Sequence, residues 1–235
     1  MQTFKTLSPE ALQHFEDQGF VVLEGLIPKQ LIPRLLDRVD GILDGRYEAL
    51  GLHHVGAGSD NAPDDPGRLN RQIVAVEFPS PDPVLHEIIS FEPLEQAAGQ
   101  LMQRDVAEIF QFQAMVKEPG CNNPTPWHQD DGYWKYDHQD QKAITAWMPL
   151  LATTAENGTM WLLPESHKGP IREHVKAGGV SDYRTVAEFI DESKLVPLEL
   201  SPGDVSFHHQ KTIHGAFSNS GTQRRVVVAS HYHSR

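Results

Sequence analysis

The chain has 235 residues, of which 39% are hydrophobic and 22% charged, a composition that excludes fibrous and disordered classes. Its formal net charge of −12 argues against a nucleic-acid-binding protein, because phosphate contacts need a basic face. The single cysteine, Cys121, excludes an internal disulfide and fits a reducing compartment, so we expect a cytoplasmic protein. The first residues carry no long apolar stretch, and we expect neither a signal peptide nor a membrane span.

Residues 1–105 have mainly the sequence pattern of helices. Ser8 and Pro9 are typical of a helix N-cap and first turn, and Gly19 is typical of the end of such a helix. Further on, apolar residues recur at the spacing of an amphipathic helix. In chain order we expect a helix over 10–17, a strand over 21–23, and helices over 28–43 and 84–102.

Residues 55–70 are rich in Gly, Asp, Pro and Asn and predict a long loop, either disordered or a lid over a site. Arg68 and Arg71 border this loop. They are either solvated, which we favour, or a clamp for an anionic substrate.

Residues 106–235 have the pattern of short strands broken by Gly and Pro, with a charged, irregular insertion over 170–192. The clearest predicted strands are 106–118, 143–150, 159–163, 195–200, 204–208 and 224–233. Many short strands after a helical start indicate a mainly β jelly roll with flanking helices. No linker divides the chain, so we expect one domain over 1–235, in which 1–105 support a β core over 106–235.

The triplet His128-Gln129-Asp130 is the motif that indicates chemistry. Residues two apart on a strand face the same side, so His128 and Asp130 can reach one metal. His214 can supply a third ligand, and two imidazoles with one carboxylate bind divalent iron on one face and leave the opposite positions open. Arg225 follows 11 residues after His214, and its guanidinium suits a bidentate contact with a dicarboxylate. The set indicates a nonhaem Fe(II), 2-oxoglutarate-dependent oxygenase.

Other polar residues on the predicted strands are candidates for lining a cavity. Gln113 shares one strand face with Gln111 and Lys117, and this polar row faces either solvent or the cavity. Thr145 and Trp147 share a face of the next long strand. We take Gln113 and Thr145 as candidate hydrogen-bonding partners of 2-oxoglutarate.

Further histidines offer alternative ligands. His208 and His209 are adjacent on a strand, so only one can point inward, and we favour a partly exposed pair at the strand end. His231 and His233 alternate on one face of the last strand, and we favour packing or solvent exposure for both.

The order of motifs resembles the phytanoyl-CoA dioxygenase family over nearly the whole chain. These motifs are GFVVLEGLIP at 19–28, WHQD at 127–130, AWMPL at 146–150, ENGTM at 156–160, LPESH at 163–167, PGDV at 202–205 and HGAFSN at 214–219. The resemblance implies a double-stranded β-helix (jelly roll, cupin-like). One departure is Glu165, where the family more often carries glycine. Glu165 is predicted to lie in a turn, so we expect little effect on the chemistry.

By this resemblance His128, Asp130 and His214 are the iron ligands. Arg225 pairs with the far carboxylate of 2-oxoglutarate, and Trp147 lies near the cosubstrate. The implied reaction uses Fe(II), 2-oxoglutarate and O2 to hydroxylate a C–H bond, with succinate and CO2 as coproducts. Related halogenases lack the carboxylate ligand, so Asp130 predicts hydroxylation.

The expected substrate is a small or medium organic molecule, and the chain is expected to be a monomer or homodimer. Nothing in the sequence forms a recognisable CoA site. Two other functions stay open. One is a cupin-type metalloenzyme independent of 2-oxoglutarate, which leaves Arg225 without a role, and the other is a non-catalytic metal-binding module.

Overall fold

The computed structural model describes residues 6–48, 52–55, 70–75, 82–105, 107–134, 142–177 and 184–234. Most of the predicted loop, residues 56–69 with Arg68, lies outside these ranges, so its role as a lid stays a prediction. In the described part of the chain, no helix combines the length and apolar character that crossing a bilayer requires.

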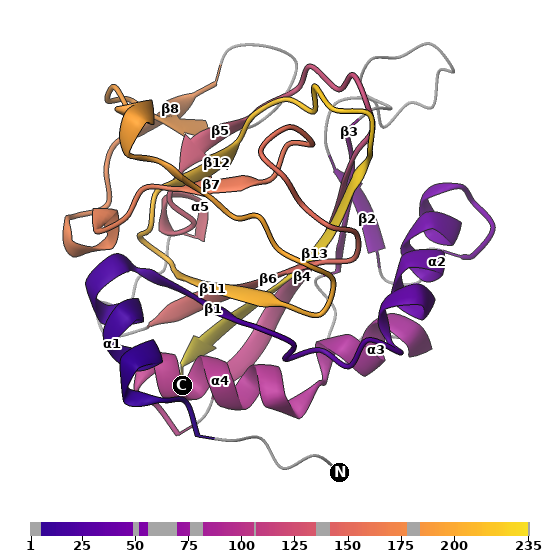
Figure 1. Cartoon of the computed structure of the whole chain (residues 1–235), viewed down its shortest axis with the longest axis horizontal. Coiled ribbons are helices and arrows are strands. Elements are labelled where there is room, and N and C mark those ends of the chain that lie inside the picture. Colours follow the sequence, from indigo (N-terminus) through magenta and orange to yellow (C-terminus); the bar gives the residue numbers. More distant parts are fainter. Residues whose placement is uncertain are drawn as a thin grey trace.

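A seven-stranded antiparallel sheet forms the larger side of the fold (Figure 1). The last strand of the chain lies at the centre of this sheet and forms antiparallel hydrogen bonds with a neighbouring strand on each side. In spatial order the strands are β1 (Phe20–Leu23), β11 (Val205–His209), β6 (Ala143–Pro149), β13 (Arg225–Ser234), β4 (Ala107–Lys117), β3 (Asn70–Ala75) and β2 (Leu52–Val55).

A four-stranded sheet forms the opposite side of the fold (Figure 1). Its strands in spatial order are β10 (Val196–Pro197), β7 (Met160–Leu162), β12 (His214–Ala216) and β5 (Thr125–His128). The segment expected to be an irregular insertion instead contains a hairpin-like pair, β8 (His174–Lys176) and β9 (Arg184–Val186). Two antiparallel sheets of this kind confirm the predicted jelly roll.

The helices cover the outer face of the large sheet, as Figure 1 shows for α1, α3 and α4. They are α1 (Pro9–Gln18), α2 (Ile32–Leu43), α3 (Pro83–Ile89) and α4 (Glu92–Met102). Ser8 caps α1 by accepting a hydrogen bond from the amide of Ala11, and Gly19 ends it with a φ of 83°, both as predicted. A one-turn helix, α5 (Asp131–Trp134), and two 3-10 turns, η2 (Ser166–Lys168) and η3 (Glu192–Lys194), are the other elements in the described ranges.

Strand alternation gives the large sheet two different faces. On β13, Val226 and Val228 point outward into the main core with the helices, whereas Val227 and Ala229 point inward toward the small sheet. The outer face is almost entirely apolar. The inward face carries the polar and charged residues considered below, so the fold separates its packing surface from its site.

Two predicted features of the N-terminal part differ from the structure. Three strands, β1 to β3, lie within residues 1–105 and join the large sheet, so this part does more than support a separate β core. The single helix expected over 84–102 is two helices, because α3 ends at Ile89 and a new helix starts with Pro93 in its first turn. Proline is favourable there but lacks the amide that a continuous helix needs.

Glu165 adopts a φ of 65°, in the left-handed region that only glycine enters without strain. Its carboxylate lies 2.7 Å from Lys168 Nζ in the turn that forms η2. The predicted turn is confirmed, and its backbone conformation is one that glycine would adopt without strain.

Asp82 links two helices through a fully buried carboxylate. It caps α3 by accepting hydrogen bonds from the amides of Val84 and Leu85, both at 3.0 Å, and it pairs with Arg38 of α2 at 2.7 Å. We expect Asp82→Ala to lower the free energy of unfolding by roughly 3 kcal/mol, because a cap is lost and a largely buried guanidinium loses its partner. Urea denaturation measures this change. Glu87→Ala, which removes the exposed pair with Arg34, should lower it by less than about 1 kcal/mol.

Candidate metal centre

His128 and His214 lie opposite each other on paired strands of the small sheet. His128 ends β5, His214 begins β12, and their ring centroids are 4.2 Å apart. Asp130 Oδ1 lies 3.7 Å from Nε2 of His128 and 3.5 Å from Nε2 of His214. The potential ligand atoms of the three residues all lie within 4.8 Å of one another. The structure therefore brings the three predicted ligands together.

The local geometry differs from the expected strand alternation. Strand β5 ends at His128, and Asp130 lies in the turn that leads into α5, where its carbonyl accepts a hydrogen bond from the amide of Tyr133. Gln129 points away and is fixed by the carbonyl of Lys211 at 2.8 Å and the amide of Arg172 at 2.7 Å. The turn, held by Gln129, directs the carboxylate back toward His128.

Both ligand histidines present Nε2 to the centre because Nδ1 is used elsewhere. Nδ1 of His128 lies 2.7 Å from the carbonyl of Pro126, and Nδ1 of His214 lies 3.0 Å from the carbonyl of Thr212. A carbonyl only accepts, so Nδ1 carries the proton and Nε2 keeps its lone pair. Burial lowers the pKa of His128 to about 3 and that of His214 to about 4, so both are neutral at physiological pH. Neutral imidazoles are the form that binds a metal.

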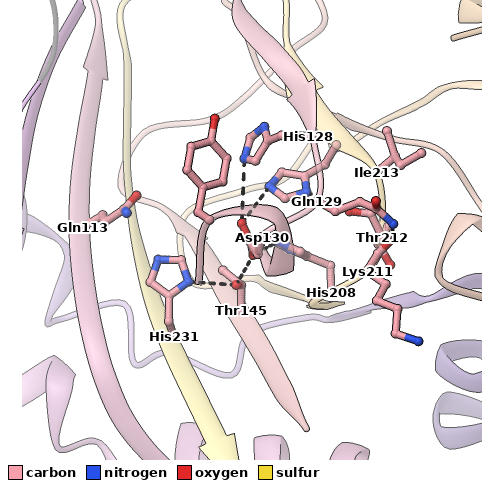
Figure 2. A network of polar contacts seen from close by, with 12 residues as sticks. Gln113, His128, Gln129, Asp130, Thr145, His208, Lys211, Thr212, Ile213 and His231 are labelled. Carbon is pink, nitrogen blue, oxygen red and sulfur yellow. Dashed lines mark hydrogen bonds and ion pairs between the residues drawn. The ribbon is translucent and has the colours of Figure 1, made fainter. Parts of the chain in front are cut away.

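The second oxygen of Asp130 is held from the large sheet (Figure 2). Oδ2 accepts a hydrogen bond of 2.7 Å from the Thr145 hydroxyl and lies 3.3 Å from Nε2 of His208. Because Thr145 gives its only proton to the carboxylate, it accepts from Nδ1 of His231, which lies 2.9 Å away. Burial alone would raise the pKa of Asp130, but His214 and His208 lower it well below its usual value. Contacts of this kind orient a ligating carboxylate.

His208 of this network is more buried than the sequence indicated, because it is 1% exposed whereas we expected a partly exposed pair at 208–209. His231 is 5% exposed, which agrees with the packing that we expected as one alternative. His208 points from β11 toward the small sheet, where it contacts Asp130 and the ring of His214. His209 points the other way and is half-buried, as alternation requires.

The predicted cosubstrate residues occupy the inward face of the large sheet. Arg225, at the start of β13, is 3% exposed, and its Nη1 donates to the carbonyl of Gly158 at 3.2 Å. Trp147 is buried in the inward apolar cluster. Gln113 is half-buried opposite Ala229 and accepts a hydrogen bond from Gln72 at 3.2 Å. The hydroxyl of Thr145 donates to Asp130, and its contact with 2-oxoglutarate stays a prediction.

Two further cations differ in their surroundings. Arg71 was expected to be either solvated or a clamp for an anionic substrate. It instead forms ion pairs with Asp44 at 2.9 Å and Glu118 at 3.1 Å, and these contacts within the protein do not support the clamp. Lys117 is fully buried directly opposite Arg225. Burial, and then the charge of Arg225, lowers the pKa of Lys117 well below its usual value. The sequence predicted that Lys117 and Gln113 lie on the same face of one strand. It did not indicate that Lys117 lies opposite Arg225 on the neighbouring strand.

Comparisons with known proteins agree with this architecture. The phytanoyl-CoA dioxygenase (PhyH) family profile matches residues 15–227. The peroxisomal phytanoyl-CoA dioxygenase of Rattus norvegicus is 30% identical, over 97% of this chain and 69% of its own length. The ectoine dioxygenase of Bordetella parapertussis is 25% identical, over 97% of this chain and 76% of its own. The crystal structure of EvdO2 from Micromonospora carbonacea var. aurantiaca complexed with 2-oxoglutarate has a TM-score of 0.76 and 21% identity, and the match covers 100% of this chain and 94% of that one.

The buried histidines predict a pH dependence of stability in the metal-free protein. Burial lowers the pKa of both His214 and His231 to about 4, whereas an unfolded histidine titrates near 6.5. Between these values the unfolded chain binds protons that the folded one does not. Stability is therefore lost as the pH falls from about 6.5 toward 4, by up to about 1.4 kcal/mol per pH unit for each histidine.

Urea denaturation at a series of pH values measures this slope. His231→Gln should make the slope shallower, whereas substitution of the exposed His14 should leave it unchanged. An identical slope in wild type and His231→Gln would contradict the prediction.

Proposed function

The chain belongs to the phytanoyl-CoA dioxygenase family, as its motifs indicated, and from this premise we propose that it hydroxylates a C–H bond of a small or medium organic substrate. The predicted enzyme class and cosubstrates, a dioxygenase that uses Fe(II), 2-oxoglutarate and O2, are confirmed for the family. The observation that carries the proposal for this chain is the convergence of His128, Asp130 and His214 on one point of the inward surface.

The donor set fits Fe(II). Two neutral imidazoles and one ionised carboxylate approach from one side, and this arrangement leaves the opposite coordination positions for cosubstrate and oxygen. When bound, the iron supplies the centre at which O2 oxidatively decarboxylates 2-oxoglutarate and oxidises the substrate. Asp130 fills the third protein position, which supports hydroxylation over halogenation, since the halogenases related to this family lack that carboxylate.

The other residues bind, orient and exclude water. Arg225 would hold the distal carboxylate of 2-oxoglutarate, and its buried guanidinium in a chain with a net charge of −12 supports this role. Trp147 contributes apolar surface to the inward side of the large sheet and so would keep water from the reacting groups. Thr145 and His208 hold Asp130 Oδ2, which leaves Oδ1 for the metal. We also propose a cytoplasmic protein, monomeric or homodimeric, without a nucleic-acid partner.

The first test concerns the metal. Asp130→Ala removes one of three ligands, and we expect the affinity for Fe(II), or for Co(II) as a spectroscopic substitute, to fall by more than about 100-fold. Metal titration under anaerobic conditions measures it. Asp131→Ala is the matched control, because this neighbouring carboxylate contacts Gln210 and points away from the ligand group. Unchanged metal affinity in the Asp130 variant would remove the assignment.

The second test concerns the cosubstrate. Arg225→Ala should raise the 2-oxoglutarate concentration needed for half-saturation by about 100-fold, because a charge-assisted contact worth a few kcal/mol is lost. Anaerobic titration of the weak visible charge-transfer band of the Fe(II) protein measures binding, and succinate formation measures turnover. Arg224→Ala is the control, since its guanidinium pairs with Asp40 on the outer side.

These measurements also separate the proposal from its alternatives. A metalloenzyme independent of 2-oxoglutarate would bind the metal and form no succinate with any substrate. A non-catalytic module would bind the metal without consuming 2-oxoglutarate. Stimulation of succinate formation by one compound in a library of small organic molecules is the result that supports a hydroxylase.

A further inference from the structure

We propose that His231 is a substrate-binding residue and that it accepts a hydrogen bond from a hydroxyl or N–H group of an otherwise apolar substrate. This inference rests on the proposed function and deepens it, because it names the chemical class of the substrate. It concerns the C-terminal half of β13, whereas Arg225 begins that strand.

One ring nitrogen of His231 supports the metal ligand, and this fixes the role of the other. Nδ1 donates to the Thr145 hydroxyl at 2.9 Å, because Thr145 gives its own proton to Asp130. Burial lowers the pKa of His231 to about 4, so the ring is neutral at physiological pH and Nε2 carries a lone pair. Nε2 can therefore accept a hydrogen bond but cannot donate one.

This acceptor is buried, and it has no hydrogen-bond partner within the described part of the chain. His231 is one of the least exposed polar residues on the inward face of the large sheet, and Figure 2 shows its second ring nitrogen turned away from Thr145. A buried acceptor without a donor is unfavourable, and native proteins contain few of them. A donor group of the substrate would supply the hydrogen bond.

Two aromatic rings lie beside this acceptor, and one of them is there because of an irregularity in the sheet. The pairing of β13 with β4 shifts after His231, and Phe110 is the extra residue on β4 at that point. A bulge of this kind redirects a side chain. The Phe110 ring lies 6.1 Å from the ring of His231 and 5.0 Å from that of Trp134, which in turn lies 5.2 Å from His231. Both aromatic rings offer apolar contact without a charge, which favours an apolar substrate body.

The acceptor and the rings lie next to the metal ligands. Trp134 ends α5, the helix that follows Asp130, and its amide donates to the carbonyl of Asp130 at 3.2 Å. The ring of Tyr133, in the same turn, meets the ring of His128 edge-on with centroids 5.3 Å apart. A substrate that donates to His231 and packs against Trp134 would therefore hold its C–H bonds beside the candidate metal site.

Support of Asp130 does not account for this arrangement by itself. Thr145 donates to Oδ2 of Asp130 from its own hydroxyl, and His208 lies 3.3 Å from the same oxygen. The contact of His231 with Thr145 uses Nδ1 alone. It leaves the buried lone pair of Nε2 without a function.

The first experiment compares compounds that differ only in the donor group. The probes are neutral cyclic and aromatic alcohols and secondary amines, each beside its O-methyl or N-methyl counterpart. Succinate formation is measured at saturating Fe(II) and 2-oxoglutarate, so that an effect through Asp130 changes both members of a pair equally. In the wild-type protein we expect the half-saturating concentration to be at least about tenfold lower for the donor than for its methylated counterpart.

His231→Phe should abolish this preference by weakening the donor compounds about tenfold and leaving their methylated counterparts unchanged. His14→Phe is the control, because this exposed histidine should affect neither. Equal stimulation by both members of the pairs in the wild-type protein overturns the inference, and so does a preference that persists in His231→Phe. If His231→Phe does not fold, as judged by circular dichroism, His231→Leu carries the same comparison.

The second experiment needs no substrate. Nitrogen NMR of the protein loaded with Zn(II) and 2-oxoglutarate shows which ring nitrogen of His231 carries the proton, and the signals lost in His231→Gln identify this ring. A proton on Nδ1 alone supports the inference, whereas a proton on Nε2 overturns it. If the wild-type protein binds no 2-oxoglutarate, the proposed function fails as well, and this is seen before any variant is compared.

Discussion

The site depends on one buried carboxylate, that of Asp130, and on the groups that keep it ionised and oriented. A buried negative charge is unfavourable unless hydrogen-bond donors or cations surround it. Oδ2 receives the Thr145 hydroxyl and faces His208 on the large sheet, so Oδ1 is left facing the two ligand imidazoles of the small sheet. The carboxylate thus connects the two sheets, and the candidate metal site combines residues next to or on β5 and β12 of the small sheet with supporting residues on β6 and β11 of the large one.

The large sheet tolerates polar groups on its inward face because its outward face forms the main apolar core and so stabilises the fold. Outward residues of β4, β6, β11 and β13 form one apolar core with the four long helices, and burial of that surface is the main favourable term in folding. The inward face is then free to hold polar and charged groups, namely the Asp130 network and the buried register partners Lys117 and Arg225.

The elements that have a continuous pattern along the sequence were predicted correctly. Strand β13 was expected at 224–233 and is found at Arg225–Ser234, because its apolar run and alternation are continuous in the sequence. The cap at Ser8 was found for the same reason. The division of 84–102 into two helices was missed, although Pro93 marks the second start. Strands β2 and β3 were missed because residues beside a Gly-rich and Pro-rich stretch give little periodic signal.

The sequence by itself determined the ligand types, their order and the family, since these depend on residue identity and spacing along the chain. Only the tertiary structure decided that Asp130 acts from a turn, that His208 and His231 are buried beside it, and that Lys117 lies opposite Arg225. Each of these facts depends on strand register and on which strands become neighbours. Register is set by packing across the whole sheet, and a one-residue shift would turn every inward side chain outward.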